Sequence, residues 1–207
     1  MSQIEAVVFD IGNVLIEWQP ERHYDRLVGP ARRQAFFEAF DFHGLMNRID
    51  EGAPFGPTIT ATAEAHPDWA TELCILRDNW GDLAQPEISH SVRLMRALKA
   101  RGVPVFILSN FGAENFPESE AQFPFLREFD RHYISGRMGM RKPDPAIYRA
   151  VEEDSGVAPN TLLFADDRHE NIDAARARGW NVHLFETPTG WANCLVDAGL
   201  LSREEAL

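Results

Sequence analysis

The chain has 207 residues, of which 44% are hydrophobic and 25% are charged, as in an ordinary globular protein. This length suits one domain with a sizeable insertion, or two small domains. The formal net charge of −12 argues against a nucleic-acid partner, and no apolar run approaches the roughly 18 residues of a membrane span.

The first predicted element is a β-strand over residues 6–9, an apolar run that ends at Asp10. Between residues 18 and 85 the pattern changes, because aromatic and helix-forming residues recur at helical spacing and strand-like runs vanish. A Gly- and Pro-rich run over 51–57 separates two helical stretches there. A helical insertion directly after the first strand would stand over Asp10, so we expect residues 18–85 to form a small helical cap.

Strands and helices alternate through the rest of the chain. The pattern predicts helices over 86–102, after Pro143 and over 171–178, and strands over 104–108, 133–134, 162–165 and 182–185. This alternation predicts an α/β fold, a Rossmann-like parallel sheet with helices on both faces. The expected domains are residues 1–17 with 86–207 as the core, and 18–85 as the cap.

Polar residues stand where three of the apolar strands end: Asp10, Ser109-Asn110 and Asp166-Asp167. Open α/β sheets bind ligands outside the carboxyl ends of their strands, so these side chains can converge on one crevice. The adjacent carboxylates of Asp166 and Asp167 repel each other and need a cation to offset them. Mg²⁺ prefers a few carboxylates with waters and phosphate oxygens, which makes Asp10 with Asp167 a plausible pair of ligands.

Each residue also has an ordinary structural explanation. Asp10 can be a nucleophile or a metal ligand, but also a turn or helix-capping residue. Ser109, with exposed backbone N–H groups, can hold a phosphate oxygen or begin a helix. Lys142 precedes Pro143 and can supply a point charge, although surface lysines are commoner. Their order and shared placement at strand ends favour a site for Mg²⁺ and a phosphoryl group.

With these clusters in this order, the chain resembles the haloacid dehalogenase-like hydrolase superfamily. The family's four motifs match residues 7–15, 107–110, 139–148 and 164–172, and the segment around Lys142 is the most specific of them. The resemblance covers nearly the whole chain, and the helical insertion is similar to the family's small helical cap. The pattern is most similar to that of bacterial sugar-phosphate phosphatases such as α-D-glucose-1-phosphate phosphatase.

The resemblance implies a hydrolase of phosphoric monoesters whose substrate is a small phosphorylated metabolite, in the first place a sugar phosphate. Asp10 would attack phosphorus and form an aspartyl-phosphate, which water then hydrolyses. Ser109 and the backbone N–H of Asn110 would hold the phosphoryl oxygens, and Lys142 would stabilise charge on them and on Asp10. Positioning and electrostatics carry most of phosphoryl transfer, so this set of residues suffices for the first step.

The resemblance also implies a Mg²⁺ cofactor. Its ligands would be the Asp10 carboxylate, the carbonyl oxygen of Gly12 and Asp167. Asp166 would support a metal-bound water, and Asn171 would orient that shell.

One position departs from the typical phosphatase motif. Two residues after the nucleophile that motif has a second aspartate, the general acid/base, whereas this chain has Gly12. Loss of a positioned acid/base typically costs about 10²–10⁴-fold in rate. A water, His43, Asp50 or Glu17 could substitute, and the spacing selects none of them.

Three alternatives remain. A 2-haloacid dehalogenase also lacks the second aspartate, but its metal-free reaction gains nothing from Asp166 and Asp167. A receiver-type signalling module would need its acidic pair at the first strand. A catalytically weak binding or regulatory protein could use the same scaffold.

The remaining expectations concern location and assembly. No signal peptide is visible, and Cys74 and Cys194 lie too far apart for a metal-binding spacing. We therefore expect free thiols in a cytoplasmic protein with no membrane partner, present as a monomer or homodimer.

Overall fold

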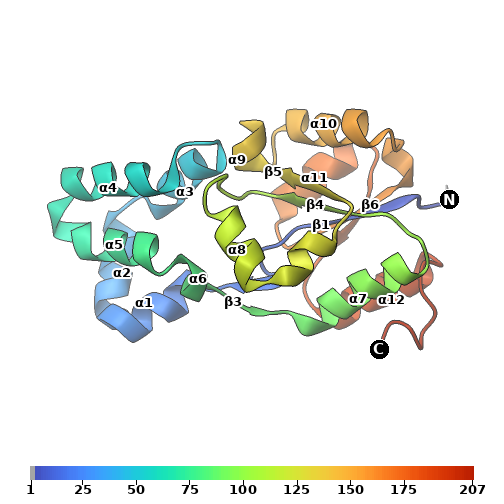
Figure 1. The fold of residues 1–207 in the computed structure, drawn as a ribbon, viewed down its shortest axis with the longest axis horizontal. Coiled ribbons are helices and arrows are strands. Elements are labelled where there is room, and N and C mark those ends of the chain that lie inside the picture. The colour runs from blue at the N-terminus through green and yellow to red at the C-terminus, as the bar shows by residue number, and fades with distance from the viewer. Residues whose placement is uncertain (1–2) are drawn as a thin grey trace.

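The computed structural model describes residues 3–207, so residues 1 and 2 of the predicted core range lie outside the described part. Five parallel strands form the central sheet in the order β5-β4-β1-β6-β7 (Figure 1). Their bounds are β1 (Ala6–Phe9), β4 (Val105–Ser109), β5 (Arg131–Ile134), β6 (Leu162–Asp166) and β7 (Asn181–Leu184). The predicted α/β fold with a parallel sheet is confirmed.

Helices cover both faces of this sheet (Figure 1). One face is covered by α7 (Ser89–Ala100) and α12 (Pro188–Asp197), and the other by α10 (Pro145–Ser155) and α11 (His169–Ala177). Along β1 the side chains alternate, because Val7 and Phe9 join one hydrophobic cluster whereas Ala6 and Val8 join the other. A strand buried on both faces reads as a continuous apolar run, which explains the sequence signal.

The region between β2 and β3 is helical and lies beyond the carboxyl end of β1, at the left of Figure 1. Its helices are α1 (Pro20–Val28), α2 (Pro30–Ala39), α3 (Phe42–Asp50), α4 (Phe55–Ala65), α5 (Ala70–Asp78) and α6 (Trp80–Leu83). We call α1 to α6 the helical lobe. Tyr24 and Phe36 are fully buried inside it, and the Tyr24 hydroxyl donates to the Glu72 carbonyl oxygen at 2.7 Å. The lobe therefore has packing of its own.

The predicted helix over 86–102 is wrong at its start. Residues Ala84–Glu87 form strand β3, which pairs antiparallel with β2 (Ile16–Trp18), and helix α7 begins only at Ser89. Strands this short give no periodic signal, and each is formed by pairing with a segment far away in the sequence. This two-stranded sheet carries the chain into and out of the lobe.

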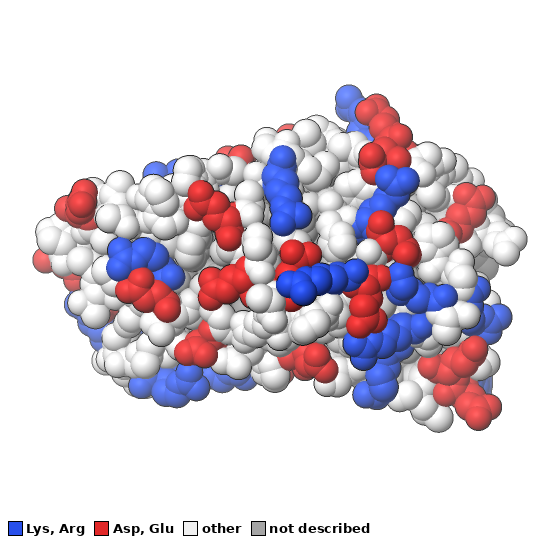
Figure 2. Space-filling view, in the orientation of Figure 1, with Lys and Arg blue, Asp and Glu red and all other residues white. Residues whose placement is uncertain are grey.

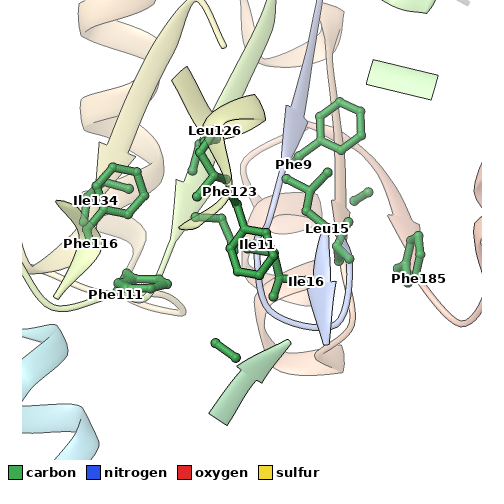
Figure 3. Packing of buried hydrophobic residues seen from close by; sticks show 14 of the residues in the cluster. Phe9, Ile11, Leu15, Ile16, Phe111, Phe116, Phe123, Leu126, Ile134 and Phe185 are labelled. Carbon is green, nitrogen blue, oxygen red and sulfur yellow. The ribbon is translucent and has the colours of Figure 1, made fainter. Parts of the chain in front are cut away.

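The turn after β1 is buried and internally hydrogen-bonded. The carbonyl oxygen of Ile11 accepts from the N–H groups of Leu15 at 2.9 Å and Ile16 at 3.0 Å. Figure 3 shows these three side chains among the buried hydrophobic residues, in the same cluster as Phe9 and Phe111. Apolar packing of the turn residues therefore fixes the backbone that carries Asp10.

The surface carries both signs of charge. In the view of Figure 2, Lys and Arg are interspersed with Asp and Glu, so this face shows no continuous basic stripe. Cys74 and Cys194 are free thiols, as expected. Among residues 3–207, no helix combines the length and the apolar character that crossing a membrane requires.

Candidate active site

Three neighbouring strands bring the predicted site residues together. Asp10 follows β1, Ser109 ends β4 and Asp166 ends β6, and these strands are adjacent in the sheet. The Ser109 hydroxyl donates to Asp10 Oδ1 at 2.6 Å. The Lys142 ammonium nitrogen lies 2.9 Å from Asp10 Oδ1 and 2.7 Å from Asp166 Oδ2. Four residues spread over 157 positions of sequence (10 to 166, both included) thus form one contact network.

The two oxygens of Asp10 differ in their surroundings. Oδ1 accepts from Ser109, from Lys142 and from the N–H of Ile11 at 2.7 Å. Oδ2 has no hydrogen-bond donor among the described residues. Burial raises the pKa of Asp10 to about 6, the Lys142 charge opposes that rise, and the neighbouring carboxylates add to it. One oxygen is therefore fixed, and the other is left for a ligand or for attack.

Lys142 is held in place from several sides. Its ammonium also donates to the Leu108 carbonyl oxygen at 2.8 Å, and the residue is only 1% exposed. The Asn110 side chain pairs with the lysine backbone in both directions, accepting from its N–H at 2.8 Å and donating to its carbonyl oxygen at 2.9 Å. Burial alone would lower the pKa of Lys142, but the carboxylates of Asp10 and Asp166 outweigh burial and raise it. The sequence did not predict this use of the Asn110 side chain.

Asp166 is fully buried, and both of its oxygens are engaged. Oδ1 accepts from the Arg168 N–H at 2.8 Å and from the Asn171 amide at 2.9 Å. Oδ2 accepts from Lys142 and from the same amide at 3.0 Å. This arrangement suits a residue that positions its neighbours better than one that binds a metal directly.

An acidic cluster lies at the carboxyl ends of β1 and β6. Asp10, Asp166 and Asp167 each offer an oxygen, and these oxygens lie within 4.8 Å of one another. Burial raises the pKa of Asp167, and a hydrogen bond from Asn13 to Asp167 Oδ2 at 2.9 Å partly offsets this. Carboxylates held this close repel one another, and hard oxygen donors are what Mg²⁺ prefers. The donor set fits that ion.

Asn13 has a role that the sequence analysis missed. Its backbone φ is 54°, a left-handed conformation that asparagine tolerates better than most residues with side chains. The side chain accepts from the Trp18 N–H at 3.0 Å and donates to Asp167. Asn13 thus ties the turn after β1 to the end of β6. The Gly12-Asn13 pair indicates a tight turn from the sequence, whereas no sequence signal indicates the hydrogen bond to Asp167.

A cavity of about 220 Å³ opens above Asp10, between the sheet and the helical lobe. The three candidate proton donors, Glu17, His43 and Asp50, all line it. Glu17 forms an exposed ion pair with Arg22, whose guanidinium nitrogen lies 2.9 Å from the carboxylate. Asp50 ends α3 and accepts no hydrogen bond from the described residues. Burial raises the pKa of Asp50 to about 7, and the charge of Arg141 opposes that rise.

One wall of the cavity is aromatic. The ring centroid of Trp80 lies 5.1 Å from that of Trp18 and 5.4 Å from that of Phe111. The indole N–H of Trp80 donates to the Ser119 hydroxyl at 3.2 Å, within the protein interior. Trp80 therefore has no free polar atom to offer a ligand.

A Rossmann-like α/β fold that gathers a carboxylate, a buried lysine and an acidic pair at the carboxyl ends of its strands has the arrangement of an enzyme site. The sequence profile of the haloacid dehalogenase-like hydrolases matches residues 4–179. The chain belongs to this family, which confirms the resemblance and the prediction of a hydrolase.

Two relatives that match along most of their length are named as phosphatases. The chain is 28% identical to a sesquiterpene phosphatase of Aspergillus oryzae over 199 residues, or 90% of this chain and 92% of the relative. It is 23% identical to a D-ribitol-5-phosphate phosphatase of Bacteroides thetaiotaomicron over 202 residues, or 91% and 95% of the two chains. These names support a phosphatase-type hydrolase.

A solved structure shares the fold. A haloacid dehalogenase family enzyme from Bacteroides thetaiotaomicron, in complex with magnesium and inorganic phosphate, is similar with a TM-score of 0.70 and 24% sequence identity. The similarity covers 88% of this chain and 94% of that one.

Proposed function

We propose that this chain is a Mg²⁺-dependent phosphatase that hydrolyses a small phosphomonoester through an aspartyl-phosphate. The carrying observation is the environment of Asp10. One carboxylate oxygen is fixed by Ser109 and Lys142, while the other has no donor within residues 3–207, at the floor of a cavity that admits a small molecule. A carboxylate held in this way is oriented for attack on phosphorus.

In the first step, an Asp10 oxygen forms a bond to phosphorus while the bond from phosphorus to the substrate oxygen breaks. The departing alcohol oxygen takes up a proton. The positive charge of Lys142 offsets the repulsion between the negative charges of the Asp10 carboxylate and the phosphoryl oxygens. The Ser109 hydroxyl and the Asn110 N–H donate hydrogen bonds to those oxygens. In the second step, water attacks the aspartyl-phosphate, inorganic phosphate leaves and the Asp10 carboxylate is restored.

Mg²⁺, when bound, would neutralise charge on the phosphoryl oxygens and the nucleophile. Asp10, Asp167 and the Gly12 carbonyl oxygen would hold it. Asp166 would not bind the ion directly but would position Lys142 and Asn171, which donate hydrogen bonds to it. The acidic cluster supports this cofactor, and so does the magnesium-bound neighbour of the same fold.

Residues 18–85 would act as the cap that closes the site over the core, residues 1–17 and 86–207. Two contacts that join the lobe to the core beside the cavity support this division. Arg141 Nε lies 2.8 Å from Glu51 Oε1, and the Phe55 N–H donates to Glu114 Oε2 at 2.8 Å. A covered site excludes water while the acyl phosphate forms.

The aromatic wall favours an apolar organic group on the phosphate. Trp18, Trp80 and Phe111 present ring surfaces to the cavity. Burying a hydrocarbon group against these rings is favourable, whereas the hydroxyl groups of a sugar would find no hydrogen-bond partners on them. The relatives do not decide this point, because one acts on a sesquiterpene compound and another on a sugar-alcohol phosphate. The sugar phosphate predicted from the sequence stays a prediction.

The decisive test is phosphate release from p-nitrophenyl phosphate with and without Mg²⁺. We expect Mg²⁺-dependent turnover that Asp10→Asn abolishes and Asp173→Asn, on exposed α11 surface, leaves unchanged. Radiolabelled phosphate should be trapped on wild-type protein by rapid acid quenching. Halide release from 2-chloropropionate without metal, in place of phosphatase activity, would instead identify a dehalogenase. No turnover on either substrate would favour the binding protein.

The substrate class is settled by a screen scored by kcat/KM. Alkyl phosphates of increasing chain length are compared with hexose phosphates. An apolar site predicts a gain of roughly fourfold per added methylene until the cavity is full, the ratio that corresponds to about 0.8 kcal/mol per buried methylene. A higher kcat/KM for hexose phosphates than for every alkyl phosphate would favour the sugar-phosphate prediction instead.

A further inference from the structure

The proposed reaction lacks a proton donor at its usual place. Gly12 stands two residues after Asp10 and has no side chain. A Cβ built on Gly12 would lie 3.8 Å from Trp18 Cβ, so the aromatic wall already borders the space into which a side chain would extend. An alkoxide is a poor leaving group, and a second group must therefore protonate it.

The position of that group follows from the geometry of the reaction. In phosphoryl transfer the attacking and leaving oxygens lie roughly in line on opposite sides of phosphorus. Asp10 forms the floor of the cavity, so the leaving oxygen points up towards the helical lobe. Helix α3 turns one face to the cavity there, with His43, Met46, Asn47 and Asp50 at successive helical turns.

We propose that Asp50 is the general acid that protonates the leaving alcohol, and the general base that activates water in the second step. This inference rests on the proposed phosphatase function. Asp50 is the only carboxylate of α3, and it lines the same cavity as Asp10. It has no hydrogen-bond donor within residues 3–207, so its oxygens are available to a substrate.

The electrostatic surroundings suit both roles. The charged groups that act on Asp50 are Arg141, Lys142 and Arg168, which favour its ionised form, and Asp10, which disfavours it. Burial outweighs the cations and raises the pKa of Asp50 to about 7. A general acid works best with a pKa near the operating pH, because both protonation states are then accessible.

The protons balance over the cycle. While the Asp10–phosphorus bond forms and the bond from phosphorus to the alcohol oxygen breaks, the Asp50 proton moves to that oxygen. The Asp50 carboxylate then takes a proton from the water that attacks the aspartyl-phosphate. Phosphate leaves, Asp10 is again a carboxylate and Asp50 is again protonated.

The experiment compares two leaving groups in Asp50→Asn. An alkyl phosphate needs a proton on its leaving oxygen, whereas p-nitrophenolate is a stable anion that leaves without one. We expect kcat/KM for the alkyl phosphate to fall about 10²–10⁴-fold, and that for p-nitrophenyl phosphate to change by less than about fivefold. Loss of the base should also slow the second step, so Asp50→Asn should release p-nitrophenol in a burst followed by a slow phase.

Other variants separate the explanations. Glu64→Gln removes an exposed carboxylate of the lobe and should leave both substrates unchanged. Asp50→Glu should recover part of the alkyl phosphatase activity. An equal loss on both substrates in Asp50→Asn would overturn the role, and so would a loss selective for alkyl phosphate in His43→Gln or Glu17→Gln. Absence of wild-type activity towards p-nitrophenyl phosphate would instead overturn the phosphatase proposal itself.

Stability without metal gives an independent measurement. The folded pKa of Asp50 is raised, so its contribution to stability is full below its unfolded pKa near 3.8 and is lost as pH rises through about 7. The urea midpoint of Asp50→Asn, measured as a difference from the wild-type midpoint at the same pH, should therefore be more favourable at pH 8 than at pH 4. An identical difference at both pH values would show that Asp50 is ionised throughout this range and would overturn its role as an acid.

Discussion

Lys142 and Asp166 form a fully buried ion pair, with Nζ 2.7 Å from Oδ2 and neither side chain more than 1% exposed. The same ammonium lies 2.9 Å from Asp10 Oδ1. A single positive charge thus compensates two buried carboxylates that come from the ends of different strands. Because residues 3–207 form no other ion pair with either carboxylate, the lysine is a structural necessity as well as a candidate catalytic group.

Replacement of this lysine should destabilise the fold in a pH-dependent way. Lys142→Met leaves Asp10 and Asp166 as unpaired buried acids, and breaking such a pair costs about 3–5 kcal/mol. Without the lysine the pKa of Asp10, already about 6, rises further, so stability is lost as pH rises through that range. Urea unfolding without metal should show a larger loss at pH 8 than at pH 5. Lys99→Met, which breaks an exposed pair with Asp130, should cost about 0–1 kcal/mol at either pH.

Mg²⁺ should stabilise the folded chain, because it binds the folded acidic cluster and has no such site in the unfolded chain. The thermal midpoint should therefore rise with Mg²⁺ concentration, and above the dissociation constant it should keep rising with the logarithm of that concentration. Asp167→Asn should suppress this rise, while Asp173→Asn on the exposed surface should retain it. A chelator should abolish turnover, and excess Mg²⁺ should restore it. A wild-type thermal midpoint that does not change with Mg²⁺ concentration would count against the metal site.

Two substitutions at Asn13 should separate backbone strain from hydrogen bonding. Asn13→Gly keeps the left-handed backbone at low strain but loses the bonds to Trp18 and Asp167. Asn13→Ala loses the same bonds and adds roughly 1 kcal/mol of strain. Both should weaken Mg²⁺ binding about 10–100-fold, as loss of a residue that orients a metal ligand typically does. Calorimetric titration measures the affinity, and equal stability of the two variants would argue against strain.

The side chain of Met46 should set the preference for chain length. It lines the cavity from α3 and is only partly buried, so its truncation removes ligand contact with little loss of core packing. Met46→Ala should raise KM severalfold for a long alkyl phosphate and leave that for methyl phosphate unchanged. The short substrate is the internal control. A uniform change in KM would mean that Met46 does not contact the organic group.

Several features of the site were accessible from the sequence. Continuous apolar runs identified β1, β4 and β6, and polar residues at their ends identified Asp10, Ser109 and Asp166. This works because a strand buried on both faces must be apolar throughout, and its first polar residue then marks the exit from the sheet.

Other features were not accessible. Strands β2 and β3 have three and four residues, and only their mutual pairing makes them strands. The contacts of the Asn110 side chain with Lys142 and of Asn13 with Asp167 join residues 32 and 154 positions apart. No local pattern encodes such partners.

The sequence by itself determined the kind of fold, the family and the residue types of the site, since these depend on periodicity and on polar residues at strand ends. Only the tertiary structure decided how those residues divide the work. It engaged both oxygens of Asp166, left Asp10 Oδ2 without a donor from residues 3–207 and placed Asp50 in the lining of the same cavity as Asp10. Burial and hydrogen-bond partners arise from segments that meet only on folding, and they set the charge and availability of each group.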